Sequence, residues 1–146
     1  MRAIYNAIYN VFLGDADLKV ALPGGLHFLI AKQDSRGDPT VYPYATYFPI
    51  TQTSRKHTFS NDVESILFQI TVVGDSYEHM VVAFAAFVGG RSPQRGFDYA
   101  VISVDGFEDA KLERQPATYQ HDSENNKWRL IITYRLDLEK IDTVRT

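Results

Sequence analysis

Apolar residues near the N-terminus recur with a helical period. Ile4, Ile8 and Phe12 fall on one face of a helix, and Gly14 ends that segment. A shorter apolar stretch follows and stops at the Pro-Gly-Gly sequence of residues 23–25. We therefore expect one long and one short helix before the first strand.

Residues 75–88 form the second strongly helical pattern. Asp75 is placed to cap its N-terminus, Glu78 to complete a capping box, and Gly89 and Gly90 to end it. A helix on the surface of a monomer normally exposes a polar face to solvent. This one is apolar almost all round, so we expect two of its sides to be buried against other elements or subunits. Its broad apolar stripe is Tyr77, Met80, Val81, Phe84, Phe87 and Val88, and its remaining face is Val82, Ala83, Ala85 and Ala86.

Alternation of apolar and polar residues marks the clearest strands. In residues 127–138, apolar side chains from Trp128 to Leu138 occupy every second position, which predicts one packed face and one wet face. Residues 63–74 give the strongest buried strand. The residues on its main apolar face are Ile66, Phe68, Ile70 and Val72.

The remaining strands are weaker signals. Pro43 and Pro49 cannot donate to a ladder, so residues 41–50 should form an edge strand or be paired only in part. Residues 51–62 read as a polar loop with a basic tip. Further strands are expected at residues 26–32, 99–104 and 110–120, the last in a hairpin with 127–138.

The order of these elements predicts an α+β fold, with a mainly antiparallel mixed sheet and two main helices packed on one face. A single domain spanning residues 1–146 is expected. Its parts are an N-terminal helical segment (1–25), a first strand group (26–74), the helix (75–88), and a C-terminal strand and hairpin (99–138).

Composition narrows the possible functions. Apolar residues make up 45% of the chain, which is enough for a packed core, and there is no cysteine for a disulfide or a thiolate metal site. Fifteen basic and eighteen acidic residues give a net charge of −3, which argues against a protein held on nucleic acid by phosphate contacts. No apolar run reaches the roughly 18 residues of a membrane span, so no membrane partner is expected.

Catalytic signatures are absent from the sequence. It has no glycine-rich phosphate loop and no nucleophile elbow, and its aspartates border predicted elements as turn or cap residues. The four histidines are scattered without the spacing of a zinc helix. We therefore expect no enzyme, no catalytic residue, no metal and no cofactor. The histidines are His27, His57, His79 and His121.

Two segments admit both a binding and a structural interpretation. Arg55, Lys56 and His57 would either contact an acidic partner or form a solvated tip. The aromatic residues of 41–50 resemble a stacking platform for bases, but the net acidity favours edge-strand packing or a subunit contact.

Several stretches together resemble the tail-completion or tail-terminator proteins of long-tailed bacteriophages. The resemblance covers nearly the whole chain, apart from "RSPQRGFD" (91–98) and "HDSENN" (121–126). The matching stretches are "IYNAIYNVFLGDADLKVALPGGLHF", "YPYATYF", "ESILFQITVVGDSYEHMVVAFAAFVGG" and "KWRLIITYRLDL".

This resemblance implies a structural virion protein of the phage neck, assembled in the host cytoplasm. Family members form a closed ring, often a hexamer, that caps the head-proximal end of the tail tube and stops its polymerisation. The partners implied are further copies of the chain, the tail tube protein, and a head connector or stopper protein. DNA passes through the lumen without sequence-specific binding.

The alanine face of helix 75–88 would be covered by the N-terminal helix or, in a ring, by the next subunit. Arg55, Lys56 and His57 become candidates for docking to the tail or the connector. Two alternatives stay open: another neck component, such as a head-closure or head–tail adaptor protein, and a small-molecule-binding or enzymatic α+β domain with a pocket under the aromatic segment. The candidate subunit-interface residues are Ala83, Ala86, Phe87, Tyr42, Tyr44 and Tyr47.

Overall fold

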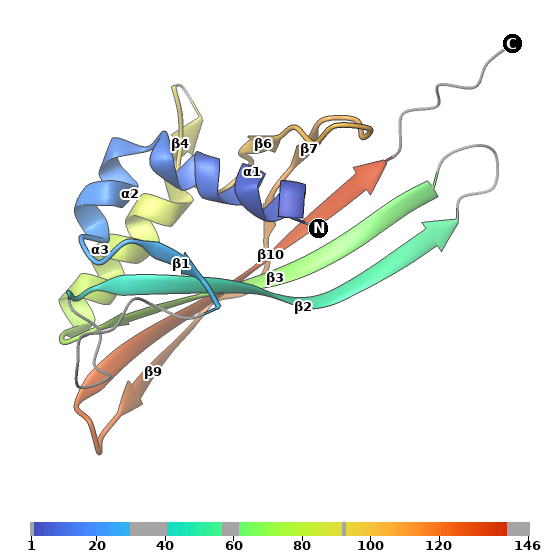
Figure 1. Cartoon of the computed structure of the whole chain (residues 1–146). Coiled ribbons are helices and arrows are strands. Elements are labelled where there is room, and N and C mark those ends of the chain that lie inside the picture. Colours follow the sequence, from blue (N-terminus) through green and yellow to red (C-terminus); the bar gives the residue numbers. More distant parts are fainter. Residues whose placement is uncertain (1, 30–40, 57–61, 92, 140–146) are drawn as a thin grey trace, which may run out of the picture.

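The computed structural model describes residues 2–29, 41–56, 62–91 and 93–139 (Figure 1). These residues form three helices, namely α1 (Arg2–Leu13), α2 (Ala16–Ala21) and α3 (Tyr77–Val88). The longer strands are β1 (Leu26–Phe28), β2 (Tyr44–Lys56), β3 (Asp62–Gly74), β9 (Thr118–Asp122) and β10 (Lys127–Glu139). The two-residue strands are β4 (Gly90–Arg91), β5 (Gln94–Arg95), β6 (Val101–Ile102), β7 (Ala110–Lys111) and β8 (Glu113–Arg114).

The main sheet is built around three long antiparallel strands. Its order is β1-β2-β3-β10-β8, and β9 also pairs with β10. Only the β1–β2 pair is parallel among the strands of this sheet. The helices lie on one side of the sheet (Figure 1). The predicted α+β class, with a mainly antiparallel mixed sheet and helices on one face, is confirmed.

The core lies between the helices and one face of the sheet. Side chains of β10 alternate as predicted, with buried residues at every second position from Leu130 to Leu138. The predicted apolar face of β3 is also buried, and so are Ile4, Ile8 and Phe12 of α1. Period-two and helical patterns therefore locate the core correctly where one face of an element is apolar and the other is polar.

Three predicted strands are shorter than expected. Strand β1 contains Leu26–Phe28 and ends before Leu29, which has a positive φ of 68°. Residues 30–32 of the predicted strand lie outside the described residues. Strand β6 contains only Val101–Ile102 and pairs with β7 in a separate two-stranded sheet. The predicted hairpin with β10 is present, but its first arm is Thr118–Asp122.

The prediction of a loop at residues 51–62 is wrong over most of its length. Strand β2 continues to Lys56, and the ladder with β3 runs from Thr51↔Leu67 to Lys56↔Asp62. An irregularity in register falls between Pro49 and Thr51, where proline removes a backbone donor. The ladder to β3 continues through these polar residues, since each non-proline residue carries a backbone donor and acceptor.

The start of α3 differs from the predicted capping box. Ser76 is the N-cap, and its hydroxyl accepts a hydrogen bond from the His79 N–H at 3.2 Å. Asp75 lies one residue too early for this role and instead pairs with Lys127 of β10. Glu78 therefore does not stand at the capping-box position. The end of the helix is as predicted, since Gly89 is the C-cap with φ 60°.

Among the residues that the structure describes, no helix has the length and apolarity needed to cross a membrane.

Candidate assembly surfaces

One side of α3 belongs to the chain's own core. Met80, Ala83 and Phe87 are completely buried, and the Phe87 ring lies edge-on to Phe97 with centroids 5.1 Å apart. The side of α3 that faces the core therefore differs from the predicted apolar stripe, because it includes Ala83. Ala83 and Phe87, two of the expected interface residues, are inaccessible to a second subunit in this fold.

A second side of α3 is covered by aromatic residues of the sheet edge. The Tyr77 ring lies edge-on to Trp128 of β10, with centroids 5.0 Å apart. Phe84 packs edge-on against Tyr119 of β9 at 6.2 Å. These ring contacts cover this side of α3 only in part, since Tyr77 is 48% exposed and Val81 43% exposed.

The third side of α3 is exposed and faces α2. Between the two helices lies a depression of about 360 Å³, which we call the α2–α3 groove. Val20 on α2 is 81% exposed and Val82 on α3 is 51% exposed, so two large apolar side chains that line one depression are both open to solvent. The groove is lined by Asp17, Val20, Ala21, Val82, Ala85 and Ala86. Of the expected interface residues on α3, Ala86 alone lies there.

The aromatic segment splits into buried and accessible parts. Tyr47 is buried, and its hydroxyl donates to the Tyr5 backbone carbonyl at 3.2 Å. Tyr42 and Tyr44 are partly exposed, with ring centroids 5.6 Å apart. The Lys127 ammonium lies 4.4 Å from the centre of the Tyr42 ring. Tyr42 and Tyr44 therefore remain surface candidates, whereas Tyr47 belongs to the core.

The expected docking residues lie at the far end of the β2–β3 hairpin. Arg55 and Lys56 are the last residues of β2, paired with Val63 and Asp62 of β3. Their side chains, and the whole of His57, lie outside the described part of the structure. Their role stays a prediction, now placed on a strand end instead of a free loop.

The described residues give no support for a metal centre. They contain no group of three or more histidine, cysteine, aspartate or glutamate side chains that would hold a metal ion. His27 contacts the Gly24 carbonyl at 2.7 Å, and His121 stacks on Trp128 with ring centres 4.6 Å apart. His79 is exposed on α3. Each of these histidines thus sits in a structural or solvent-exposed setting.

Sequence reasoning missed a buried carboxylate, Asp98. Its Oδ1 accepts a hydrogen bond from the Tyr134 hydroxyl at 2.8 Å, and both its oxygens accept from the Arg114 Nε. Burial, and next the charge of Asp98, raise the pKa of Tyr134 far above its ordinary value. The hydrogen bond to Asp98 raises the pKa of Arg114. The carboxylate is fully partnered, which is the arrangement of a structural anchor and not of a reactive acid.

A second buried carboxylate, Asp15, joins α2 to the chain after β5. Its Oδ1 accepts from the Leu18 N–H at 3.0 Å as the N-cap of α2. Its Oδ2 accepts from the Gly96 N–H. The sequence signalled the cap but not the second bond, which joins residues far apart in the chain. This bond fixes the position of α2 beside α3 and so shapes the groove.

Comparison with known proteins gives a strong structural likeness. No protein family model matches this chain, and no curated protein matches it. Among solved structures, a chain from the virion of a native gene transfer agent particle has a similar fold, with a TM-score of 0.74. The two chains share 16% sequence identity, and the alignment covers 94% of this chain and 95% of that one. At this identity the likeness shows a common fold.

Proposed function

We propose that this chain is a structural protein of a phage-like virion. One observation carries the proposal: almost the whole chain, and almost the whole of a virion chain, share one fold. The fully partnered state of Asp98 agrees with a structural role.

The finer proposal is a ring that caps the head-proximal end of the tail tube, stops its growth and docks the tail to the head. The α2–α3 groove supports self-association, because burying its apolar surface against a partner lowers the free energy of the assembly. A contact between this groove and a different surface of the next copy is heterologous, and such contacts form a ring when the rotation between copies closes. A hexamer is the proposed form, with DNA passing through its lumen.

The assembly state tests the ring. Native mass spectrometry of the full chain should give a closed oligomer, either alone or after addition of purified tail tubes. Val82→Glu would place a carboxylate in the groove and should leave a folded monomer, because a buried unpaired charge costs several kcal/mol. Asn6→Glu adds the same charge to an exposed position of α1 and should assemble normally. A wild-type monomer that also fails to bind tail tubes would contradict the ring.

The docking role of the hairpin end is tested separately. Arg55→Glu with Lys56→Glu should leave the thermal unfolding temperature unchanged but reduce the yield of joined particles counted by electron microscopy. Overlong tubes would indicate failure of termination. Tails of normal length without heads would instead indicate a head-closure or adaptor role. Normal infectious yield at low and high salt would show that these charges only contact water.

A further inference from the structure

The loop that follows β5 is held in place at almost every residue. The Phe97 and Asp98 N–H groups both donate to the Phe87 carbonyl, at 2.7 and 3.2 Å. The Asp98 carboxylate binds Tyr134 and Arg114, as described above. Three of the four side chains from Phe97 to Ala100 are buried. The loop is therefore a rigid platform.

Tyr99 differs from its neighbours on this platform in its exposure. Its side chain is 47% exposed, although its neighbours on both sides are buried. Its backbone has φ 61°, a left-handed conformation that is unfavourable for a bulky residue. The bond from the Tyr99 N–H to the Leu112 carbonyl at 2.9 Å holds it there. Strain of this kind persists only where the surroundings enforce it, and it is concentrated at functional positions.

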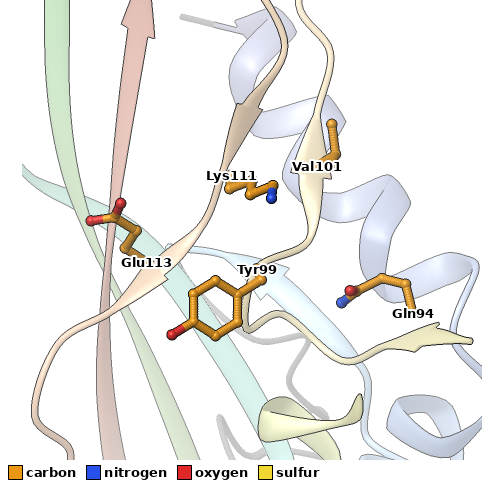
Figure 2. Close-up of a pocket in the computed structure, with 5 residues that line it drawn as sticks. All are labelled: Gln94, Tyr99, Val101, Lys111 and Glu113. Carbon is orange, nitrogen blue, oxygen red and sulfur yellow. The ribbon is translucent and has the colours of Figure 1, made fainter. Parts of the chain in front are cut away.

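The Tyr99 ring stands in a surface depression of about 510 Å³, which we call the Tyr99 depression (Figure 2). Figure 2 shows the ring between Gln94 on one side and Glu113 on the other. Val101 and Lys111, paired across β6 and β7, form another part of the lining. Val101 is also largely exposed, so the depression combines an aromatic and an aliphatic surface open to solvent.

The charges around the Tyr99 depression are unevenly compensated. Glu113 is neutralised by Arg135, whose Nη2 lies 2.7 Å from its Oε2. A smaller depression of about 280 Å³ adjoins it at Tyr99, and Arg114 there is neutralised by Asp98. Within the part of the chain that the structure describes, Lys111 makes no ion pair. The lining of the Tyr99 depression therefore carries one uncompensated positive charge.

We infer that the Tyr99 depression binds a segment of another protein in which an aliphatic side chain lies next to a carboxylate. The aliphatic group packs on Tyr99 and Val101, and the carboxylate pairs with Lys111. Rigid, exposed tyrosines are enriched among residues that dominate binding energy, because ordering them on binding costs little entropy. The site is complete within one chain, so it does not depend on the proposed ring.

Nucleic acid fits this depression poorly. A phosphate backbone needs several cations in a row, whereas the lining offers one lysine and also contains the Glu113 carboxylate. A single lysine beside an aliphatic surface matches a single carboxylate on a protein segment. DNA binding at these residues is accordingly an outcome that would count against the inference.

The test uses the full chain labelled with ¹⁵N and a short blocked peptide that alternates leucine and aspartate. We expect saturable amide shifts at Tyr99, Val101 and Lys111 in the millimolar range. Lys111→Glu should weaken binding about tenfold, since it removes an attraction and adds a repulsion. A second peptide with lysine in place of aspartate should bind Lys111→Glu better than the wild-type chain.

Matched variants control for folding and for general charge. Lys19→Glu changes an exposed lysine of α2 and should bind the aspartate peptide like the wild type. Tyr99→Ala should weaken both peptides, because both use the aromatic surface. Lys111→Met removes the charge without reversal and serves if Lys111→Glu is poorly folded. Equal peptide binding by the wild type, Lys111→Glu and Lys111→Met would overturn the inference. Amide shifts confined to other parts of the surface, or no saturable shift, would also overturn it. So would tighter binding of a DNA oligonucleotide than of the aspartate peptide.

Discussion

The Tyr134 hydroxyl donates a hydrogen bond to Asp98 Oδ1 at 2.8 Å, inside the protein between β10 and the loop after β5. Arg114 Nε approaches the other carboxylate oxygen at 2.9 Å from β8. The Phe68 and Phe97 rings lie 5.8 and 5.7 Å from the Tyr134 ring and exclude water from it. The Tyr134 hydroxyl therefore depends on Asp98, because solvent cannot reach it to replace a missing partner, whereas Arg114 is partly exposed.

This dependence predicts unequal costs for the two ends of the hydrogen bond. Tyr134→Phe leaves Asp98 bound to Arg114, so the free energy of unfolding should fall by about 1 kcal/mol. Asp98→Ala leaves the buried Tyr134 hydroxyl without a partner, while water can still solvate the partly exposed Arg114, so it should cost about 2 kcal/mol. Urea unfolding of both variants measures this difference. A larger loss in Tyr134→Phe than in Asp98→Ala would contradict this description of the network.

Stability should also fall at alkaline pH. The pKa of Tyr134 is raised above its ordinary value near 10 by burial and by Asp98, so the folded state favours the neutral phenol. A group with a raised pKa contributes its full stability below the unfolded pKa and loses it progressively as the pH rises above about 10. Burial also raises the pKa of Tyr47. The unfolding free energy should thus decline above about pH 10, and less steeply in Tyr134→Phe. Equal alkaline slopes in the two proteins would exclude Tyr134 as a cause.

The sequence predicted correctly those elements that have one apolar face and one polar face. Strand β10 alternates strictly, so its buried face from Leu130 to Leu138 was assigned correctly. Helix α3 has few polar residues to orient it, and its inward side was therefore assigned partly wrongly. Residues 51–56 carry no apolar alternation, and only pairing with β3 reveals them as a strand. Local patterns cannot report such long-range pairing.

The candidate surfaces were less predictable than the fold. Ala86 was chosen as an interface residue because α3 needed cover, and it does line the α2–α3 groove. Val20 was not chosen, since one apolar residue in a short helix gives no warning that it stays exposed. Tyr99 was read as part of a strand, and no sequence signal marks its left-handed conformation. Such sites depend on which distant residues meet, as Leu112 does with Tyr99.

Two alanines of α3 should respond differently to the same substitution. Ala83 is completely buried, so Ala83→Glu should lower the free energy of unfolding by several kcal/mol or prevent folding. Ala86 lines the open groove, so Ala86→Glu should fold with a loss of about 1 kcal/mol or less. Thermal unfolding and native mass spectrometry of both variants check the pair. If Ala86→Glu keeps the wild-type assembly state, the groove is not a subunit contact.

The last prediction concerns Gly96, where the chain passes against the end of α3. Gly96 has φ 77°, and a Cβ there would lie 2.5 Å from the Phe87 carbonyl oxygen and 2.7 Å from that of Ala86. These are backbone atoms of the last helical turn, which cannot move without disturbing the C-cap at Gly89. Gly106 is the matched control, because it has φ 88° but no atom within 4 Å of the added Cβ.

Gly106→Ala should therefore cost only the conformational strain, about 1 kcal/mol. Gly96→Ala adds a steric clash to that strain and pulls the Gly96 N–H away from Asp15, so we expect a loss of about 3 kcal/mol or more. Urea unfolding of the two variants under the same conditions measures the difference. Since the Asp15–Gly96 bond also positions α2, Gly96→Ala should change the amide shifts of Val20 and Val82 in the groove while Gly106→Ala leaves them unchanged. Equal losses of stability in the two variants would mean that the close approach of Gly96 to α3 is not a constraint on this fold.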